Sequence, residues 1–442
     1  MHTILIFGAG KSATVLIDYL GRCCDENNWS LLVCDSNLDL AESKVKKFSS
    51  ARAISVNVSN DDARCSLISD ASLVISMLPP TLHFIVAKDC VDYSKSLLTA
   101  SYLDASIKSL ENEIQEKGLI FLSEMGLDPG IDHMSAMKII DTIKKEGGKI
   151  KSFKSHCGGL IAPESDDNPW HYKITWNPRN VVMAGSAGAI FLENNQTVKI
   201  PYKDIFKDEN NSVDIPGLFP LAWYANRDSM SYIDTYNLHG VSDFIRTTLR
   251  YPSFCKGWNK IVALNLTNAD DHEIIMECNT FESWFNLKKH ILLEEKKATV
   301  NEDSFFDTEF LEQIDFLSMR SEEIIPQGKN NSADILQFLL EKKLVMKPDD
   351  KDMIVMLHEI EYIINGHPKK ISSCLIVKGD NDLYTSMAKT VGLPLGIAAK
   401  LILQNKIKLT GIHIPVIPEI YEPVLKELAE NGIQFTEEEF SL

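Results

Sequence analysis

A glycine-rich turn near the N-terminus constrains the fold of this chain most strongly. A short apolar run, Thr3 to Phe7, leads into Gly8-Ala9-Gly10-Lys11-Ser12-Ala13, and an apolar helical pattern follows. Glycines at the first and third positions permit a tight turn and a close approach of a pyrophosphate to the backbone, and a small sixth residue allows close packing of helix on strand. The amides at the start of the helix can bind phosphate. The segment therefore predicts a dinucleotide-binding unit.

An acidic residue follows at a spacing that fits this interpretation. A second strand pattern, Leu31 to Cys34, ends at Asp35, 25 residues after Gly10. A carboxylate at this place accepts hydrogen bonds from the adenosine ribose and repels a 2′-phosphate, so Asp35 favours NAD over NADP. In the alternative interpretation, Asp35 caps the helix expected at residues 38–48.

Further strand patterns recur at the spacing of an α/β fold. Residues 72–78, 97–100 and 119–122 each form an apolar run that ends at turn or polar residues, and amphipathic stretches separate them. This alternation predicts a doubly wound parallel sheet of the Rossmann type. Ligands of such sheets bind beyond the carboxyl ends of the strands, so we expect Leu78 and the pair Ser101-Tyr102 to line the crevice.

Charge and cysteine content exclude several classes of function. The formal net charge of −17 argues against binding of nucleic acid or of anionic membranes. The nine cysteines are odd in number and form no CxxC pair, which argues against a disulfide framework and against a metal site. The N-terminus has no signal-peptide pattern, and no apolar run approaches the ~20 residues that cross a bilayer. We therefore expect a cytoplasmic protein that binds a small molecule.

A turn at residues 126–133 offers a candidate acid or base. Asp128 precedes a proline, which holds it extended. A carboxylate at the mouth of a dinucleotide-binding fold could transfer a proton or bind a substrate amine. It could equally cap the helix that follows, a role for which Asp132 is also suited.

The middle of the chain contains a long polar loop and three candidate arginines. Residues 157–169 are rich in Gly, Pro, Asp and Asn, and a loop of this length in a compact domain is usually functional. Arg227 lies in a polar turn, whereas Arg246 and Arg250 are one helical turn apart on residues 244–250, which we expect to be helical along with the stretch to about 350. Strand patterns return at residues 352–364 and 371–378, and helices are expected at 386–404 and 420–430.

Four motifs resemble those of the saccharopine dehydrogenase family (glutamate-forming type, also called saccharopine reductases). They are EMGLDPGIDHM (Glu124 to Met134), SHCGGLIAPESDDNP (Ser155 to Pro169), NRDS (Asn226 to Ser229) and TLRYPSF (Thr248 to Phe254). Their order and spacing match across nearly the whole chain. The resemblance implies oxidation of saccharopine at a C–N bond to give glutamate and α-aminoadipate semialdehyde, or the reverse, with NAD or NADP.

The resemblance also implies three domains and a homodimer. These are a Rossmann domain at residues 1–127, on which the C-terminal helices of residues 395–442 pack, a saccharopine-binding and dimerisation α/β domain at 128–240 and 351–394, and an all-helical insertion at 241–350.

Site residues are implied position by position. The cofactor site, which includes Gly8, falls on Ala9, Gly10, Lys11, Ser12, Asp35, Ser36, Asn37, Asn57, Val58, Leu78, Ala100, Ser101, Leu127, Asp128, Pro129, Trp176 and Asn177. The substrate site falls on Ser101, Tyr102, Asp128, Arg227, Thr248, Leu249 and Arg250. Asp128 and Cys157 are the catalytic candidates, and a packed thiol is the alternative for Cys157. Saccharopine carries three carboxylates, which guanidinium groups bind in bidentate fashion.

Three departures from the family pattern bear on function. Asp35 stands where the NADPH-dependent fungal enzymes carry an arginine, which favours NAD in this chain, while Pro80 and His156 replace tyrosines. His156 is either an acid or base, or a buried histidine.

Two other functions compete with this interpretation. A related reductive-amination enzyme, such as a carboxynorspermidine dehydrogenase, would act on a product with fewer carboxylates, so two arginines in the substrate set favour saccharopine. A non-catalytic nucleotide-binding protein would have lost substrate-side residues, yet Asp128, Arg227 and Arg250 are present.

Overall fold

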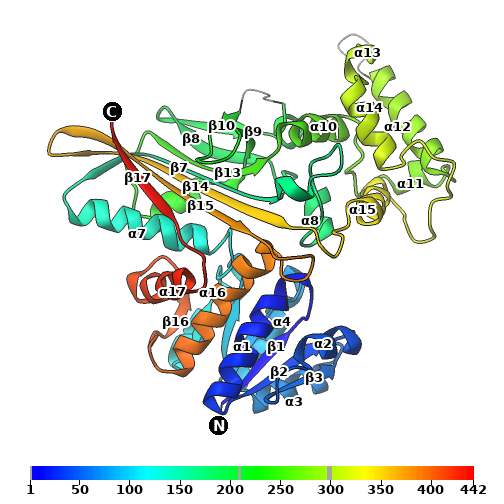
Figure 1. The fold of residues 1–442 in the computed structure, drawn as a ribbon. Coiled ribbons are helices and arrows are strands. Elements are labelled where there is room, and N and C mark those ends of the chain that lie inside the picture. Colours follow the sequence, from blue (N-terminus) through cyan, green and yellow to red (C-terminus); the bar gives the residue numbers. More distant parts are fainter. Residues whose placement is uncertain (1, 208–210, 296–300) are drawn as a thin grey trace. The chain divides into compact units, whose positions relative to one another are not determined.

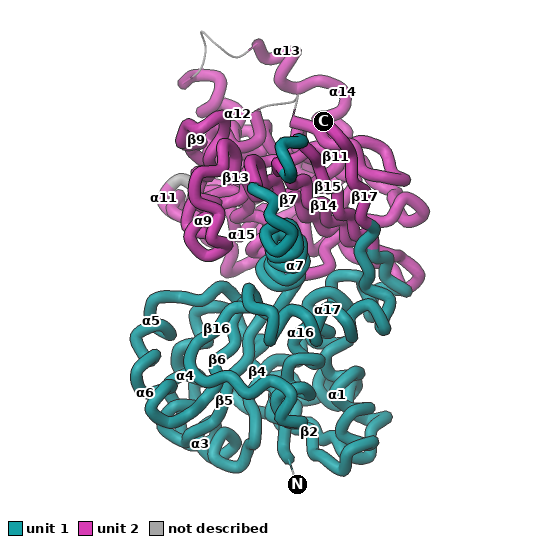
Figure 2. Tube along the Cα trace, turned by 90° about the vertical axis from the view of Figure 1, so that its left-hand side faces the viewer, with its two compact units in different colours: residues 1–149, 364–367, 377–436 teal, residues 150–363, 368–376, 437–442 magenta. Residues whose placement is uncertain are grey.

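The computed structural model describes residues 2–207, 211–295 and 301–442, and it contains two compact units (Figures 1 and 2). Unit 1 comprises residues 1–149, 364–367 and 377–436. Unit 2 comprises residues 150–363, 368–376 and 437–442.

Unit 1 is built on a parallel sheet of seven strands in the order β16-β6-β5-β4-β1-β2-β3. The strands are β1 (Thr3–Phe7), β2 (Ser30–Asp35), β3 (Ala51–Ser55), β4 (Leu73–Ser76), β5 (Ser96–Thr99), β6 (Ile120–Leu122) and β16 (Gly411–His413). Every neighbouring pair is parallel. Strands covered by helices on both faces are apolar on both faces, as in the buried run of β4. The predicted doubly wound sheet is confirmed.

Helices flank this sheet (Figure 1). The helices of unit 1 are α1 (Thr14–Asn27), α2 (Leu38–Val45), α3 (Asp61–Asp70), α4 (His83–Asp92), α5 (Ala105–Lys108), α6 (Glu111–Glu116), α7 (Ile131–Lys145), α16 (Ser386–Leu403) and α17 (Pro418–Glu430). The cap of α2 is Asn37, whose side chain accepts a hydrogen bond from the Leu40 amide at 3.1 Å. Asp35 is therefore not the cap of this helix.

Helix α16 packs along α1, at distances that only glycine permits (Figure 1). A Cβ atom at Gly392 would lie 2.7 Å from the Leu16 amide nitrogen, and one at Gly396 would lie 2.6 Å from the Tyr19 ring. Among the described residues, α16 is the one helix long and apolar enough, by length and composition, to cross a membrane, although we expected no such run. Because 67% of it is buried inside the protein, it has the character of a core helix.

Unit 2 contains a mixed sheet of ten strands, with β10-β11-β13-β7-β14-β15-β17 as its main order and β8, β9 and β12 beside it. Its strands are β7 (Lys149–Ile161), β8 (Ala189–Glu193), β9 (Gln196–Ile200), β10 (Ser212–Val213), β11 (Leu221–Ala225), β12 (Arg227–Asp228), β13 (Asp243–Arg250), β14 (Asp352–Ile364), β15 (His367–Lys378) and β17 (Thr436–Ser441). The predicted mixed α/β architecture is confirmed. The last strand, β17, differs from the helical end that the sequence suggested.

Two segments differ from the sequence-based expectation. Residues 244–250 were predicted to be helical, but they form the central strand β13, parallel to β7 and antiparallel to β11. Burial on both faces hides the alternation that would have indicated a strand. The expected loop at 157–169 begins later, because β7 continues to Ile161. Gly158 fits there because a Cβ would lie 2.5 Å from the Leu249 carbonyl oxygen.

Most helices of unit 2 lie between β13 and β14 in the sequence. They are α10 (Pro252–Ala263), α11 (His272–Ile275), α12 (Phe281–Glu295), α13 (Glu302–Phe305), α14 (Thr308–Phe316) and α15 (Ser332–Lys343), while α8 (Pro178–Val182) and α9 (Ser231–Thr235) precede β13. One core joins Trp258, Trp284 and Phe310 from these helices to Trp170 and Phe191 from the preceding chain.

Candidate active site

A pocket of about 380 Å³ lies in unit 1 at the carboxyl ends of β1, β2, β3 and β4. It is lined by Phe7, Gly8, Gly10, Cys34, Asp35, Ser36, Val56, Asn57, Val58, Ser59, Met77, Leu78, Pro79 and Leu82. Of the predicted cofactor residues, the pocket brings together Gly8, Gly10, Asp35, Ser36, Asn57, Val58 and Leu78. These residues come from four separate βα connections, which parallel pairing places at one edge of the sheet.

The glycine turn is shaped for a ligand that approaches its backbone. Gly8 has a φ of +101°, and a Cβ atom there would lie 2.9 Å from the Met77 carbonyl oxygen, so both conformation and space require glycine. No atom lies within 4 Å of the position that a Cβ would take at Gly10, which leaves its backbone open on that side. A short helical turn, Lys11–Ala13, then leads into α1. The turn fits the pyrophosphate of a dinucleotide.

Asp35 ties this turn to the next strand. Its Oδ2 accepts a hydrogen bond from the Ala9 amide at 2.7 Å, and its Oδ1 accepts one from the Asn37 amide at 2.9 Å. Each carboxylate oxygen can accept a second hydrogen bond, so the group can still receive ribose hydroxyls. The donor and acceptor set of the pocket therefore fits the adenosine end of a nicotinamide dinucleotide.

A lysine that the sequence analysis did not single out lies beside the same turn. Lys44 Nζ donates to the Gly10 carbonyl oxygen at 2.6 Å and to Thr14 Oγ1 at 2.9 Å. Burial lowers the pKa of Lys44 to about 8, against the opposing charge of Asp35. Lys44 lies on α2, outside any phosphate-binding motif, so no local sequence pattern predicts its contact with the glycine turn.

The remaining cofactor candidates lie outside the lining of this pocket. Lys11 and Ser12 are on the turn before α1, while Ala100 and Leu127 follow β5 and β6. In unit 2, Trp176 Nε1 donates to Tyr172 Oη at 2.9 Å, and Asn177 caps α8 by accepting from the Arg179 amide at 2.9 Å. The roles of these residues toward a cofactor stay predictions.

The segments after β5 and β6 run side by side in unit 1. The Met125 amide donates to the Thr99 carbonyl oxygen at 3.1 Å, and the Glu124 amide donates to that of Ser101 at 3.0 Å. This pairing brings the predicted substrate residues Tyr102 and Asp128 together, with 3.5 Å between Tyr102 Oη and Asp128 Oδ1.

The structure separates the roles of the two aspartates in the turn before α7. The N-cap residue of α7 is Gly130, and the Gly130 amide donates to Asp132 Oδ1 at 2.6 Å. Asp128 precedes Pro129 through a cis peptide bond, outside the helix. The alternative of Asp128 as a helix cap is therefore not observed. Asp132 holds the start of the helix instead.

In unit 2, the register of β13 on β7 sorts the candidate residues onto two faces. Thr248 is paired with Cys157, and Thr247 with His156. Because side chains alternate along strands, Cys157, Thr248 and Arg250 share one face. His156 belongs to the other face, where its Nδ1 lies 2.7 Å from Thr247 Oγ1.

On the His156 face, the polar side chains contact one another. His156 Nε2 lies 3.5 Å from Glu359 Oε2, and Lys370 forms an ion pair with the same carboxylate. His156 and Lys370 hold the pKa of Glu359 down, at about 2, against the effect of its burial. The Leu249 side chain is in a core cluster with Met353 and Val355, so only its backbone could reach a ligand on the Cys157 face.

Arg250 is a buried cation on the Cys157 face. It is 4% exposed, and its Nη1 donates to the carbonyl oxygens of Leu249 at 2.8 Å and Gly159 at 3.4 Å. The guanidinium carbon lies 5.4 and 5.5 Å from the ring centroids of Tyr172 and Phe254. Its Nε has no hydrogen-bond partner, and no ion pair of Arg250 is formed within the described part of the chain.

The pKa of Arg250 stays high without a carboxylate. Burial lowers the pKa of Arg250. The side chains of Tyr224, Tyr172, Cys255 and Cys157 raise this pKa and together outweigh the effect of burial. A buried cation without an acidic partner is costly in the absence of a ligand. The arrangement therefore suits an anionic ligand, and it places Cys157 near that ligand site.

The other arginines differ in setting. Arg227 is exposed on β12 and has a φ of +49°, a left-handed conformation that few non-glycine residues adopt. Arg246 is on the same face of β13 as Arg250, but its guanidinium stacks on Tyr232, with 4.5 Å to the ring centroid.

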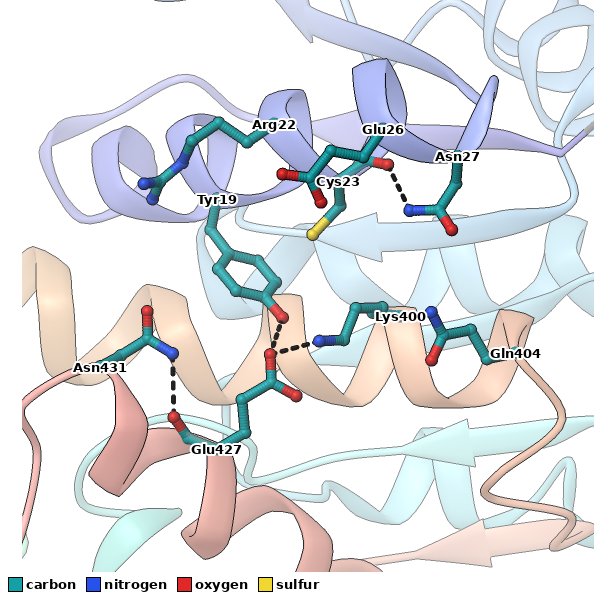
Figure 3. A pocket seen from close by; sticks show the side chains of 9 residues that line it. All are labelled: Tyr19, Arg22, Cys23, Glu26, Asn27, Lys400, Gln404, Glu427 and Asn431. Carbon is teal, nitrogen blue, oxygen red and sulfur yellow. Dashed lines mark hydrogen bonds and ion pairs between the residues drawn. The ribbon is translucent and has the colours of Figure 1, made fainter.

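A second pocket of unit 1, of about 430 Å³, is lined by α1, α16 and α17 (Figure 3). Tyr19 Oη and Lys400 Nζ both donate to Glu427 Oε1, and burial together with this contact raises the pKa of Tyr19. The pocket contains none of the predicted site residues. Its central charges pair with one another and join the three helices.

Comparisons with known proteins agree with both units. The family model described as "Saccharopine dehydrogenase NADP binding domain" matches residues 4–122, and "Saccharopine dehydrogenase C-terminal domain" matches residues 126–433. The solved structure of apo saccharopine dehydrogenase (L-Glu forming) from Saccharomyces cerevisiae covers 100% of both chains, with 31% identity and a TM-score of 0.88.

Two curated relatives show how much of each protein is shared. Saccharopine dehydrogenase [NADP(+), L-glutamate-forming] of Saccharomyces cerevisiae is 34% identical over 98% of each chain. The mitochondrial alpha-aminoadipic semialdehyde synthase of Mus musculus is 34% identical over 98% of this chain but 47% of its own length, so this chain spans about half of that protein. The chain belongs to the saccharopine dehydrogenase family.

Proposed function

We propose that this chain is a saccharopine dehydrogenase of the L-glutamate-forming type. It oxidises saccharopine at a C–N bond with NAD(P), and water then releases glutamate and α-aminoadipate semialdehyde. The yeast relative of that name supports the proposal, because it matches 98% of both chains. The observation that carries it is Arg250, a buried guanidinium without an acidic partner among the described residues, on the same strand face as Cys157. Such a group binds a substrate carboxylate by charge-assisted hydrogen bonds.

Residues of the chain would divide the work as follows. The nicotinamide cofactor, when bound, supplies the hydride acceptor. Arg250 and Arg227 bind substrate carboxylates, and Asp128, beside the Tyr102 hydroxyl, accepts a proton from the secondary amine. Withdrawal of that proton frees the nitrogen lone pair, which assists departure of hydride from the adjacent carbon. Cys157 stays a packing thiol or a proton carrier.

We further propose that Asp35 gives the enzyme a preference for NAD. Its carboxylate is fixed at the pocket by the Ala9 and Asn37 amides, where a 2′-phosphate would meet a negative charge. The yeast relative is named for NADP(+). In this chain the cation beside the glycine turn, Lys44, already donates a hydrogen bond to the Gly10 carbonyl oxygen. The three-domain division at residues 127, 240 and 350, the homodimer and the cytoplasmic location stay predictions.

The test is oxidation of saccharopine with NAD and NADP in parallel, followed by the absorbance of the reduced nicotinamide. We expect turnover with both and a higher kcat/KM with NAD. Glutamate in the product, identified by mass spectrometry, separates this enzyme from a lysine-forming one. Nucleotide binding without turnover of saccharopine would contradict the proposal, and turnover of carboxynorspermidine in the same assay would support the related enzyme instead.

A further inference from the structure

A buried histidine connects the interior of the unit 1 sheet to the predicted substrate residue Ser101. His83 is the first residue of α4, beyond the carboxyl end of β4, and it is 2% exposed. Its Nδ1 lies 2.8 Å from Ser76 Oγ, at the end of β4. Its Nε2 lies 2.7 Å from Ser101 Oγ, after β5, and 3.4 Å from Thr99 Oγ1. The imidazole therefore bridges the ends of two adjacent strands.

The imidazole is in the form that this bridge requires. Burial lowers the pKa of His83 to about 4, so the ring is neutral at physiological pH. A neutral imidazole has one donor nitrogen and one acceptor nitrogen, so the hydroxyls of Ser76 and Ser101 take opposite hydrogen-bonding roles. With the proton on Nδ1, Nε2 accepts from the Ser101 hydroxyl at 2.7 Å and fixes its direction; with the proton on Nε2, the ring donates to Ser101 Oγ and leaves the hydroxyl hydrogen for a ligand. Either bond holds the Ser101 oxygen in place.

The bridge does more than fill the interior. Ser76, Thr99 and His83 are buried, and apolar side chains would occupy such a site without the cost of burying polar groups. Ser101, by contrast, is only partly buried, and it directly precedes Tyr102, whose hydroxyl lies beside Asp128. Of the residues that contact His83, Ser101 is thus the one in the predicted substrate set.

We propose that His83 is a positioning residue that holds the Ser101 hydroxyl in the orientation needed to contact the substrate. This inference rests on the proposed function, because it assigns Ser101 to saccharopine. It adds a residue that the motifs do not include and that is not among the residues lining the nucleotide pocket.

The experiment compares His83→Leu, His83→Gln, Ser101→Ala and the double variant that combines His83→Leu with Ser101→Ala in the full-length protein. We expect His83→Leu and Ser101→Ala each to raise KM for saccharopine about tenfold, the effect of one lost hydrogen bond, with a smaller change in kcat. The double variant should show no further loss, because His83 acts through Ser101. His83→Gln, whose amide can reach Ser101, should recover most of the loss.

Two measurements separate positioning from a general structural effect. Because Ser101 is also in the predicted cofactor set, KM for saccharopine is measured at saturating nucleotide for every variant, and the melting temperature shows that each variant folds. His413→Gln is the matched control, because this partly exposed histidine of unit 1 bonds the Thr410 carbonyl oxygen, at 2.9 Å, and should leave KM unchanged.

An independent readout distinguishes failure of this inference from failure of the proposed function. Nitrogen NMR of the labelled histidines reports the His83 hydrogen bonds without any turnover, and Ser101→Ala should shift the Nε2 signal of His83. Additive kinetic losses in the double variant, or an unshifted signal, would overturn the inference. A wild-type protein that does not oxidise saccharopine, with the shift present, would refute the proposed function and with it the substrate role of Ser101.

Discussion

Replacing Arg250 by methionine tests whether its buried charge serves substrate binding or the stability of the fold. Without substrate, Arg250 has no acidic partner among the described residues, and its hydrogen bonds go to the carbonyl oxygens of Leu249 and Gly159. Methionine removes these bonds and the ring contacts, but it also removes the cost of a buried charge. We therefore expect the free energy of unfolding to change by no more than about 2 kcal/mol.

Substrate binding should suffer far more than stability. Loss of one partner from a buried charge pair costs roughly 2–5 kcal/mol, which corresponds to an increase in KM for saccharopine of about 30- to 5000-fold. Arg250→Lys keeps the charge but not the planar fork, so its KM should lie between those of wild type and Arg250→Met. The assays are steady-state kinetics at saturating nucleotide and urea unfolding of the same preparations.

Lys288→Met is the matched control. Lys288 is also a buried cation of unit 2, but its Nζ lies 2.5 Å from the Asp271 carboxylate, which is equally buried. Its loss leaves Asp271 unpaired, so the expected result is the reverse: a stability loss of about 3–5 kcal/mol and an unchanged KM. If Arg250→Met unfolds as readily as Lys288→Met and keeps a normal KM, Arg250 is structural and the reasoning fails.

Three further predictions address unit 1. Asp35→Asn keeps an acceptor for the Ala9 amide but removes the charge, so the NAD/NADP ratio of kcat/KM should fall at least about tenfold, and an unaltered ratio would remove the assigned role. Gly8→Ala forces a side chain onto a φ of +101° and against Met77, so it should cost about 1–3 kcal/mol in urea unfolding and weaken nucleotide affinity in calorimetry. His83 has a lower pKa in the folded state, about 4, than its ordinary 6.5, so the unfolded chain binds more protons between these values. Stability should therefore decline by about 3 kcal/mol in total as pH falls from 6.5 to 4, and unfolding curves of His83→Leu should lack this component.

The sequence by itself determined the nucleotide-binding half. Gly8, Gly10 and Asp35 lie together in the pocket because each occupies the end of a strand, and the strands pair in parallel with their ends at one edge. The strand and turn signals there are local, so a pattern within about ten residues suffices to predict them.

Tertiary structure decided the substrate half. Residues 244–250 have an apolar pattern compatible with a helix, and only pairing with β7 and β11, distant in the sequence, makes them a strand. Adjacent residues of a strand always point to opposite faces, and this register decides what each one meets: Cys157 shares a face with Thr248 and Arg250, and His156 shares the other with Thr247. The contact of His83 with Ser101 likewise exists only because β4 and β5 are neighbours. The burial of Arg250 follows from packing by Tyr172 and Phe254, since the energy of a charge depends on its three-dimensional surroundings and not on its position in the chain.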